Sequence, residues 1–440
     1  MASPSKVCVI GAGSSGLTAC QVLAARGIPF DCFEKGSMIG GNWRYENDNG
    51  TSSAYKSLHI NSARKLMSYR AYPMPADYPD YPSHWQVAKY FDDFAERFGL
   101  GERIAFNTEV VSAVPVDDEW EVTTEVADGE RRSERYRAVL VANGHHWQPR
   151  WPEPPFPGAE GYEGEQMHVH HYREPDVLVG KRVLVLGIGN SAVDVAVESS
   201  RIAEKTFLAM RRGAWVLPKF LGGTPIDESA PPIASYLPIP VQRFFFNRML
   251  KTAVGEMTDY GLPKPDHKLL EAHPTVSSEL LPRLGHGDIT AKPNIERFAG
   301  GRTVRFADGS EEEIDLTIYC TGYKIEFPFL DEAVFAARDN RMPLYKRVVS
   351  VENPGLYFVG FIQPLGPVMP LAEAQSEWIA ELLTGRAALP PGAQMREEIA
   401  SYESWLHKRF VSSKRHTVEV DFHPYLRELR RARKRVAGAA

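Results

Sequence analysis

The sequence predicts an α/β protein built on two βαβ units. Each unit begins with a short, largely apolar strand, at Val7–Ile10 and at Arg182–Leu186, and continues through a glycine-rich turn into a helical stretch. A second strand follows in each unit, at Phe30–Phe33 and at Thr206–Met210. Strands without an alternating polar face are typical of parallel sheets that are buried on both faces. We therefore expect two parallel sheets covered by helices.

The composition indicates a folded protein with more than one domain. The chain has 440 residues, of which 43% are hydrophobic, and this length corresponds to two or three domains. It carries 51 basic and 56 acidic side chains, which give a net charge of −5. Disordered chains combine low hydrophobicity with high net charge, and nucleic-acid binders need clustered positive charge. Neither class fits this chain, and we expect no nucleic-acid partner.

The cysteines and the hydropathy pattern bear on the cellular compartment. Four cysteines stand at positions 8, 20, 32 and 320, without the spacing of a disulfide framework, a redox dithiol or a zinc knuckle. We interpret them as small buried apolar residues. No run of 18 apolar residues predicts a transmembrane segment, and the first strand starts too early for a signal peptide. We expect a cytoplasmic protein.

The first glycine-rich turn has the spacing of a dinucleotide site. It reads Gly11-Ala12-Gly13-Ser14-Ser15-Gly16 and lies between a strand and a helix. The first glycine permits the tight turn, the second lets backbone amides approach a pyrophosphate, and the third allows close helix–strand packing. Glu34 ends the next strand, where a carboxylate accepts hydrogen bonds from a ribose hydroxyl and repels a 2′-phosphate. This turn is therefore predicted to bind FAD or NAD.

The second glycine-rich turn has the opposite charge at the corresponding position. It reads Gly187-Ile188-Gly189-Asn190-Ser191-Ala192, with alanine in place of the third glycine. Arg211 ends the following strand, where the first unit has Glu34, and Arg212 comes next. A guanidinium there favours the 2′-phosphate of NADP through charge-assisted hydrogen bonds. Two sites of opposite charge imply two different cofactors.

A protein with a flavin and an NADPH site accepts hydride and must pass the electrons on. Disulfide reductases of this architecture use a cysteine pair beside the flavin, and this chain has no such pair. The remaining acceptors are oxygen, a quinone or metal centre, and a substrate carbonyl. A sensor or scaffold that binds both nucleotides without turnover is a further alternative. No metal site is predicted, because the spacing of His168, His170 and His171 is poor for a single ligand set.

A further motif reads Tyr162-x-Gly164-x-x-x-His168-x-x-x-Tyr172. It resembles the identifier of the flavin-containing monooxygenases, with tyrosine for phenylalanine at its first position. The related Baeyer–Villiger monooxygenases end this motif with tryptophan, so Tyr172 favours the flavin-containing branch. Other segments match in family order, and they are Gly40–Trp43, Tyr55–Ser62, Gly187–Ser191, Arg211–Val216, Thr321–Tyr323, Phe327–Leu330 and Gln363–Gly366. The pattern is closest to the animal-type members, although their C-terminal membrane helix has no counterpart here.

The resemblance implies two Rossmann-like domains, with the NADP domain inserted in the FAD domain. The expected FAD-binding domain comprises residues 1–160 and 312–440, and the expected NADP-binding domain comprises residues 161–311. Within the latter, residues 222–265 are rich in proline and aromatic side chains and are predicted to be irregular. This insertion either gates substrate entry or packs on itself or on another subunit, and it is also compatible with a membrane surface. The sequence is therefore also compatible with a homodimer.

The resemblance also assigns site residues. The FAD contacts of the family correspond to Gly11, Ala12, Gly13, Ser14, Ser15, Glu34, Asn42, Trp43, Asn61 and Ser62. The NADP contacts correspond to Ile60, Asn61, Ser191, Ala192, Val193, Asp194 and Arg211. The spacing of the two turns adds Gly16, Gly187, Gly189, Asn190 and Arg212. Asn61 corresponds to the asparagine near both flavin and nicotinamide and is the expected catalytic residue, while His168 is expected to bridge the two domains through hydrogen bonds.

The activity implied by the resemblance is an oxygen-dependent monooxygenation. NADPH reduces FAD, oxygen forms a C4a-hydroperoxyflavin, and this adduct oxygenates soft nitrogen or sulfur atoms of small molecules. The partners are then a small-molecule substrate and O2. The alternative on the same scaffold is Baeyer–Villiger oxygenation of a ketone.

Overall fold

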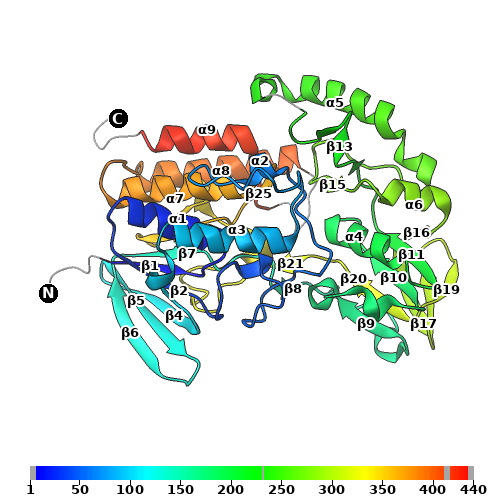
Figure 1. Ribbon diagram of the computed structural model, residues 1–440, viewed down its shortest axis with the longest axis horizontal. Coiled ribbons are helices and arrows are strands. Elements are labelled where there is room, and N and C mark those ends of the chain that lie inside the picture. Colours follow the sequence, from blue (N-terminus) through cyan, green and yellow to red (C-terminus); the bar gives the residue numbers. More distant parts are fainter. Residues whose placement is uncertain (1–5, 230–231, 411–416, 435–440) are drawn as a thin grey trace. The chain divides into compact units, whose positions relative to one another are not determined.

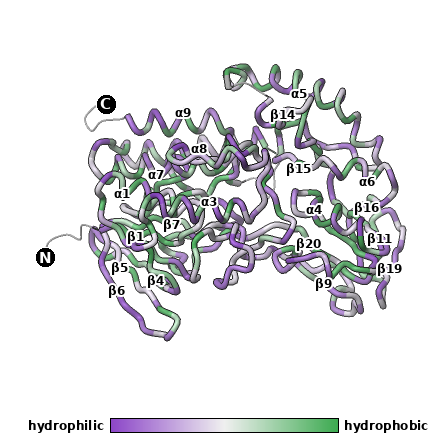
Figure 2. The backbone as a smooth tube through the Cα atoms, in the orientation of Figure 1, coloured by the Kyte–Doolittle hydropathy of each residue, from purple (hydrophilic) through white to green (hydrophobic). Residues whose placement is uncertain are grey.

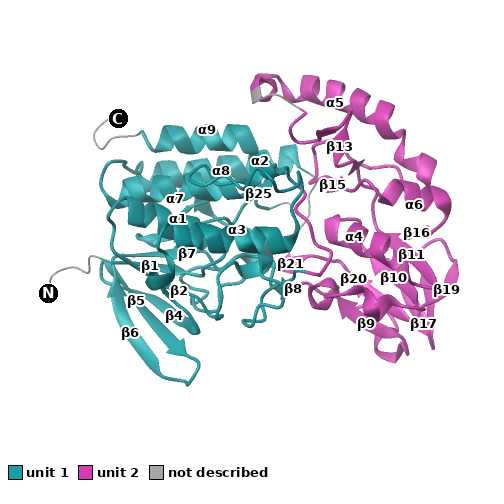
Figure 3. Cartoon of the chain, in the orientation of Figure 1, with its two compact units in different colours: residues 1–54, 62–148, 324–440 teal, residues 55–61, 149–323 magenta. Residues whose placement is uncertain are grey.

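The computed structural model describes residues 6–229, 232–410 and 417–434, and the chain divides into two compact units (Figures 1 and 3). Unit 1 comprises residues 1–54, 62–148 and 324–440, and unit 2 comprises residues 55–61 and 149–323. The chain passes from unit 1 into unit 2 after residue 148 and returns to unit 1 after residue 323. The main segment of unit 2 is therefore 12 residues longer at each end than the expected domain of residues 161–311, since 160 − 148 = 12 and 323 − 311 = 12. Within unit 2, Arg150 N donates to Gly322 O at 2.9 Å and Phe298 N donates to Pro157 O at 2.8 Å. These bonds attach the segment after residue 148 to unit 2.

Unit 1 is built on a seven-stranded sheet in the order β22-β23-β24-β7-β1-β2-β3. Its strands are β1 (Val7–Ile10), β2 (Phe30–Phe33), β3 (Ile104–Ala105), β7 (Ala138–Val141), β22 (Leu344–Tyr345), β23 (Val349–Ser350) and β24 (Leu356–Phe358). The run from β24 to β3 is parallel, and β22 and β23 pair antiparallel at one edge. All four residues of β1 and of β7 are buried, so the buried parallel strand predicted at Val7–Ile10 is confirmed.

Helices and a small second sheet complete unit 1. The helices are α1 (Ser14–Ala25), α2 (Arg64–Met67), α3 (His84–Arg97), α7 (Met369–Leu383), α8 (Gly392–Arg409), α9 (Phe422–Ala432) and the 3-10 helices η1 (Gly41–Trp43), η2 (Gly101–Arg103) and η8 (Arg338–Asn340). The antiparallel sheet contains β4 (Thr108–Val116), β5 (Glu119–Val126) and β6 (Arg131–Tyr136), and β25 (Gln363–Leu365) pairs with β26 (Glu419–Asp421). Figure 2 shows the contrast between apolar β1 and polar β6.

Residues 104–116 form two separate strands, β3 and β4. Asn107 interrupts them with a φ of +51°. Asparagine tolerates this left-handed conformation better than most residues, and a continuous strand cannot contain it.

Unit 2 is built on a five-stranded parallel sheet in the order β16-β11-β10-β20-β9. Its strands are β9 (Glu165–His168), β10 (Arg182–Leu186), β11 (Lys205–Met210), β16 (Ile289–Pro293) and β20 (Leu316–Tyr319). A smaller antiparallel sheet contains β17 (Ile295–Gly300), β18 (Thr303–Phe306) and β19 (Glu311–Glu313). Helix α4 (Asn190–Ser199) follows β10 and packs on β10 and β11. The second βαβ unit predicted from the sequence is thereby confirmed.

The remaining elements of unit 2 are short, except for one helix. The pairs are β12 (Val216–Leu217) with β15 (Thr275–Val276) and β13 (Phe220–Leu221) with β14 (Thr224–Pro225). The helices are α5 (Ile239–Val254), α6 (Leu280–His286), η3 (Ala159–Gly161), η4 (Val169–His171), η5 (Pro175–Leu178), η6 (Pro232–Tyr236) and η7 (Met257–Tyr260). The two-residue strands β8 (Gln148–Pro149) and β21 (Tyr323–Lys324) contain the points where the chain changes unit.

The prediction that residues 222–265 are irregular is wrong in part. Residues 230–231 lie outside the described residues, but α5 occupies 16 residues of the insertion. Pro238 and Pro240 stand at the start of this helix, where the missing N–H costs no intrahelical hydrogen bond. Prolines that suggested irregular structure therefore mark a helix N-terminus.

No helix within the described ranges has both the length and the apolar character to cross a membrane.

Candidate functional site

In unit 1, the turn after β1 requires glycine at its first and last glycine positions. Gly11 has a φ of +98°, and a Cβ there would lie 2.9 Å from Ala142 O. A Cβ at Gly16 would lie 1.8 Å from Gly11 O, so this position allows the close approach of α1 to the turn. These are the two packing roles that the spacing predicts.

Gly13, the middle glycine, has no such packing reason. Its φ is −75°, and a Cβ would meet nothing nearer than Gly41 Cα, at 3.6 Å, which is an ordinary contact. The chain's own packing would therefore tolerate alanine here. A backbone that stays open without an internal reason fits a group that must approach it from outside, such as a pyrophosphate.

The N-terminus of α1 begins at this turn. Gly13 is the N-cap, and no side chain caps the helix in the part of the chain that is described. The first-turn N–H groups have no intrahelical acceptor, and the helix dipole places partial positive charge on them. Leu17 N is the first to bond back, to Gly13 O at 2.9 Å. The N–H groups of Ser14, Ser15 and Gly16 can thus receive an anion.

Glu34 is buried beside the same turn, with 4% of its surface exposed. Its Oε2 accepts from Ala12 N at 2.8 Å, and its Oε1 accepts from Gly36 N at 2.9 Å and from Asn49 Nδ2 at 2.8 Å. A carboxylate has about four lone-pair positions, so three donors leave one for a ribose hydroxyl. The carboxylate also fixes the turn. The hydrogen bond from Asn49 was not predicted, because Asn49 is not part of a recognisable sequence motif.

Asn42 and Trp43 lie in η1. Asn42 Oδ1 accepts from both Ser53 N and Ser53 Oγ at 2.8 Å, and Asn42 O accepts from Ser52 Oγ at 2.9 Å. The side-chain oxygen of Asn42 therefore shapes the loop after η1. Trp43 is half-buried, as is Ser62.

Residues 55–61 belong to unit 2 and are attached to α4. Tyr55 Oη donates to Asp194 Oδ2 at 2.5 Å, and Ser57 Oγ donates to Glu198 at 3.1 Å. Ile60 is fully buried. Asn61 Oδ1 is a buried atom that has no hydrogen-bond partner among the described residues. A buried amide oxygen without a donor is costly, so Asn61 fits a position that contacts a ligand.

In unit 2, the turn after β10 is tied to the chain at both ends. Gly187 has a φ of +137°, and a Cβ there would lie 2.8 Å from Cys320 O. Ala192 is fully buried, and its methyl group fits the position of the third glycine. Asn190 Oδ1 accepts from Val276 N at 2.8 Å. Gly189 is the N-cap of α4, again without a side-chain cap in the described chain.

The residues that follow in α4 have different surroundings. Ser191 is half-buried at the first turn, whereas Val193 is fully buried in the hydrophobic core of the unit. Asp194 accepts the Tyr55 hydroxyl. Burial raises the pKa of Asp194 to about 6, against the opposing effects of the Tyr55 hydrogen bond and of the nearby Lys219 and His59.

Arg211 and Arg212 follow β11 but are not equivalent. Arg212 Nε lies 3.3 Å from Asp266 Oδ2. Arg211 is exposed and makes no ion pair or hydrogen bond with any described residue. A Cβ at Gly213 would lie 2.2 Å from Pro263 O, so the segment after the arginines packs tightly on residues 263–264. Arg211 is therefore the arginine that is available to an anionic ligand.

His168 is held inside unit 2. Its Nδ1 accepts from His170 N at 3.1 Å, so the proton lies on Nε2, which donates to Gly322 O at 3.1 Å. Burial lowers the pKa of His168 to about 4, so the ring is neutral at pH 7. Because the unit boundary lies after Tyr323, both bonds are internal, and the expectation that His168 bridges two domains through hydrogen bonds is corrected. No cluster of three or more His, Cys, Asp or Glu side chains with a metal-binding arrangement occurs in the described ranges.

The sequence and the fold are similar to those of known proteins. A family model described as flavin-binding monooxygenase-like matches residues 4–434. Flavin-containing monooxygenase 5 of Rattus norvegicus is 38% identical and flavin-containing monooxygenase 1 of Mus musculus is 33% identical, each over 96% of this chain and 82% of the relative. S-allyl-L-cysteine S-oxygenase from Allium sativum is 27% identical, with a TM-score of 0.74 over 98% of this chain and 88% of that one.

The fold extends to more distant enzymes. The open crystal structure of cyclohexanone monooxygenase has a TM-score of 0.72, with 97% of each chain covered and 18% identity. At this identity the likeness concerns the fold alone. The chain belongs to the flavin-containing monooxygenase family, whose members are monooxygenases that depend on FAD and NADPH.

Proposed function

We propose that this enzyme inserts one oxygen atom of O2 into soft sulfur or nitrogen centres of small molecules. The observation that carries the proposal is the similarity, at 27% identity over nearly the whole chain, to a plant enzyme whose name specifies S-oxygenation. The sequence supports the same branch, because Tyr172 ends the identifier motif where Baeyer–Villiger enzymes have tryptophan. Tyr172 is fully buried, and its hydroxyl donates to Glu198 at 2.5 Å, a hydrogen bond to this carboxylate that phenylalanine would not make.

The proposed FAD site lies at the first glycine-rich turn. The N–H groups of Ser14, Ser15 and Gly16 would bind the pyrophosphate, Gly13 would give it room, and Glu34 would accept from a ribose hydroxyl. When bound, FAD supplies the capacity to take a hydride from NADPH and to activate O2. The protein contributes the position of the cofactor and the exclusion of water.

The proposed NADP site lies at the second glycine-rich turn. The first turn of α4, at Ser191 and Ala192, would bind the pyrophosphate, and Arg211 would pair with the 2′-phosphate. The half-buried Asp194 is neutral below about pH 6, which limits its repulsion of the phosphates at mildly acidic pH. These assignments would give the second turn a preference for NADP over NAD.

Asn61 is the proposed catalytic residue. Its amide can both donate and accept, and its Oδ1 has no partner among the described residues. Such a side chain can hold a polar edge of the cofactor or of activated oxygen without titrating. A site of this kind depends on positioned dipoles more than on acid–base groups.

The test is a comparison of products from three substrates of similar size: a sulfide, a tertiary amine and a ketone. The purified enzyme with FAD is supplied with NADPH and O2, and the products are identified by mass spectrometry with 18O2. The proposal expects labelled sulfoxide or N-oxide, with NADPH consumed in proportion. A labelled ester or lactone from the ketone, without sulfoxide or N-oxide, would establish the Baeyer–Villiger alternative instead.

A further inference from the structure

The carboxyl ends of three parallel strands of unit 1 lie at one edge of its sheet. Val359 N, just after β24, donates to Val141 O at 2.9 Å, and Ala142 N donates to Ile10 O at 2.9 Å. Ligands of open parallel sheets bind beyond this edge. The first glycine-rich turn follows β1 there, and Gly360 follows β24 at the same edge.

Gly360 contacts the first turn of α1. Its φ is +82°, and a Cβ at this position would lie 2.0 Å from Ser15 Oγ and 3.0 Å from Ser15 Cβ. A side chain at position 360 would therefore displace Ser15. The peptide of Gly360 thus limits where the first turn of α1 can lie.

Gln375 of α7 holds this peptide. Its side chain is fully buried, and its Oε1 accepts from Gly360 N at 2.8 Å. Its Nε2 donates to Tyr425 Oη at 2.8 Å, and Tyr425 Oη in turn donates to Lys346 O at 2.7 Å. The amide orientation is determined, because Gly360 N can only donate. A fully satisfied buried chain of this kind fixes one arrangement.

The same helix holds the other side of the turn. Glu373 Oε2 accepts from Arg70 N at 2.8 Å, and Glu373 Oε1 accepts from Ala71 N at 2.9 Å. The adjacent Tyr69 is fully buried, and its hydroxyl donates to Ser14 O at 2.5 Å. Two buried side chains of α7, two residues apart, therefore bind the two backbone segments that contact Ser14 and Ser15.

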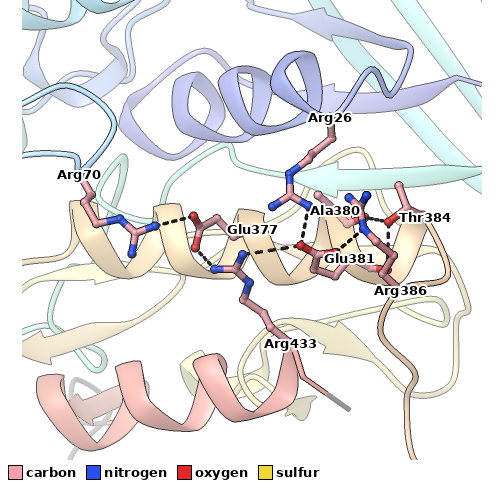
Figure 4. Close-up of polar contacts among 8 residues, drawn as sticks. All are labelled: Arg26, Arg70, Glu377, Ala380, Glu381, Thr384, Arg386 and Arg433. Atoms are coloured by element: carbon pink, nitrogen blue, oxygen red, sulfur yellow. Dashed lines mark hydrogen bonds and ion pairs between the residues drawn. The ribbon is translucent and has the colours of Figure 1, made fainter. Parts of the chain in front are cut away.

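Ion pairs attach α7 to its neighbours (Figure 4). Arg26 directly follows α1, and its Nη1 lies 2.5 Å from Glu381 Oε1. Arg433 directly follows α9 and pairs with Glu377, and its Nη2 lies 3.6 Å from Glu381 Oε1. Arg70 Nη2 lies 3.0 Å from Glu377 Oε1. Helices α1, α7 and α9 therefore share one network, and α9 also supplies Tyr425.

We propose that Gln375 and Tyr425 are positioning residues for FAD: they fix the Gly360 peptide against Ser15 and thereby hold the first turn of α1 in the conformation that binds the pyrophosphate. Their route to the cofactor is indirect, through Gly360. The inference rests on the proposed placement of FAD at this turn and extends it to the C-terminal helix α9.

The test measures FAD affinity and folding stability separately in Gln375→Met and Tyr425→Phe. FAD is titrated into the deflavinated full-length chain, and binding is followed by flavin fluorescence. Ser376→Ala is the matched control, because Ser376 is the next residue of α7, is also buried and also loses one hydrogen bond, from its Oγ to Ala372 O at 2.8 Å. We expect the dissociation constant of FAD to rise roughly 5- to 20-fold in both test variants and to stay within about twofold in the control.

Two outcomes would overturn the inference alone. The first is an FAD affinity equal to that of the wild type in Tyr425→Phe, a variant that keeps the ring and its packing. An equal loss of affinity in Ser376→Ala is the second, because the effect would then follow general destabilisation, measured as the unfolding temperature of each apoprotein. A fourth variant, Gly13→Ala, separates the two proposals: unchanged affinity there would overturn the site and the inference together, whereas a loss there with no change in Tyr425→Phe would overturn the inference alone.

Discussion

Replacement of Arg211 by alanine tests the assignment of the NADP site most directly. The guanidinium of Arg211 is exposed and has no partner among the described residues, so its removal leaves no buried charge unpaired. Hydrogen bonds to charged groups contribute about 1.5–3 kcal/mol, and exposed ion pairs up to about 1 kcal/mol. For an exposed arginine facing a phosphate we expect a loss of about 1–2 kcal/mol, which is a roughly 5- to 30-fold weaker binding of NADP⁺.

The assay compares NADP⁺ with NAD⁺, neither of which reduces the flavin. Equilibrium dissociation constants are measured with the enzyme containing FAD, at low and at moderate salt. Arg211→Ala should weaken NADP⁺ and leave NAD⁺ unchanged, and the difference should shrink as salt rises. Arg212→Ala is the matched control, and because Arg212 already faces Asp266 at 3.3 Å its effect should be about twofold or less. Equal losses for both dinucleotides, or a larger loss in Arg212→Ala, would refute the reasoning.

Three further predictions concern Gly13, Asn61 and Asp194. Gly13→Ala should fold normally, because its Cβ would meet nothing nearer than Gly41 Cα at 3.6 Å, yet its FAD dissociation constant should rise by about 5- to 150-fold from overpacking against the pyrophosphate; a reduced flavin content, with an apoprotein that unfolds at the same temperature as wild-type apoprotein, is the expected result, and unchanged flavin content contradicts it. Asn61→Ala should retain FAD, but the amount of product formed per NADPH oxidised should fall by roughly an order of magnitude, with hydrogen peroxide formed in place of the missing product. A ratio of product to NADPH equal to that of the wild type would remove Asn61 from the site. The pKa of Asp194 is about 6, so the carboxyl becomes anionic above that pH and binding of NAD⁺, which lacks a titrating 2′-phosphate, should weaken as pH rises through about 6; Asp194→Asn should remove this dependence, and a persisting pH dependence would assign it to another group.

The parts of the fold that the sequence predicts are those with local signals. The turns at Gly11 and Gly187 each lie between a strand and a helix a few residues away, so their spacing identifies them, and both glycines have the positive φ that the turn requires. Glu34 directly follows the second strand of the same βαβ unit, so the unit itself fixes its distance from the turn. It is buried beside the turn, as expected, with a hydrogen bond from Ala12 N.

The parts that the sequence does not predict depend on distant contacts. Gly360 contacts Ser15 across more than three hundred residues, and nothing near Gly360 or Gln375 indicates that contact. Arg211 and Arg212 are adjacent and chemically identical, and only the position of Asp266 distinguishes them. The helix α5 is a different case, because the prolines around it are a local signal that fits either irregular structure or the start of a helix. Proline is unfavourable in the interior of a helix but is favoured at its first position.

The interleaved order of the two units along the chain has a consequence for biosynthesis. Unit 2 takes its first segment from residues 55–61 and its last from residues that end at 323, whereas unit 1 resumes at residue 324. A ribosome therefore delivers every strand of the five-stranded sheet before it delivers β24, which completes the parallel part of the seven-stranded one. While unit 2 is synthesised, the strands β1, β2 and β7 of unit 1 lack their parallel neighbour β24. Premature termination between Tyr323 and Leu356 should accordingly leave unit 2 with its complete five-stranded sheet and unit 1 without β24.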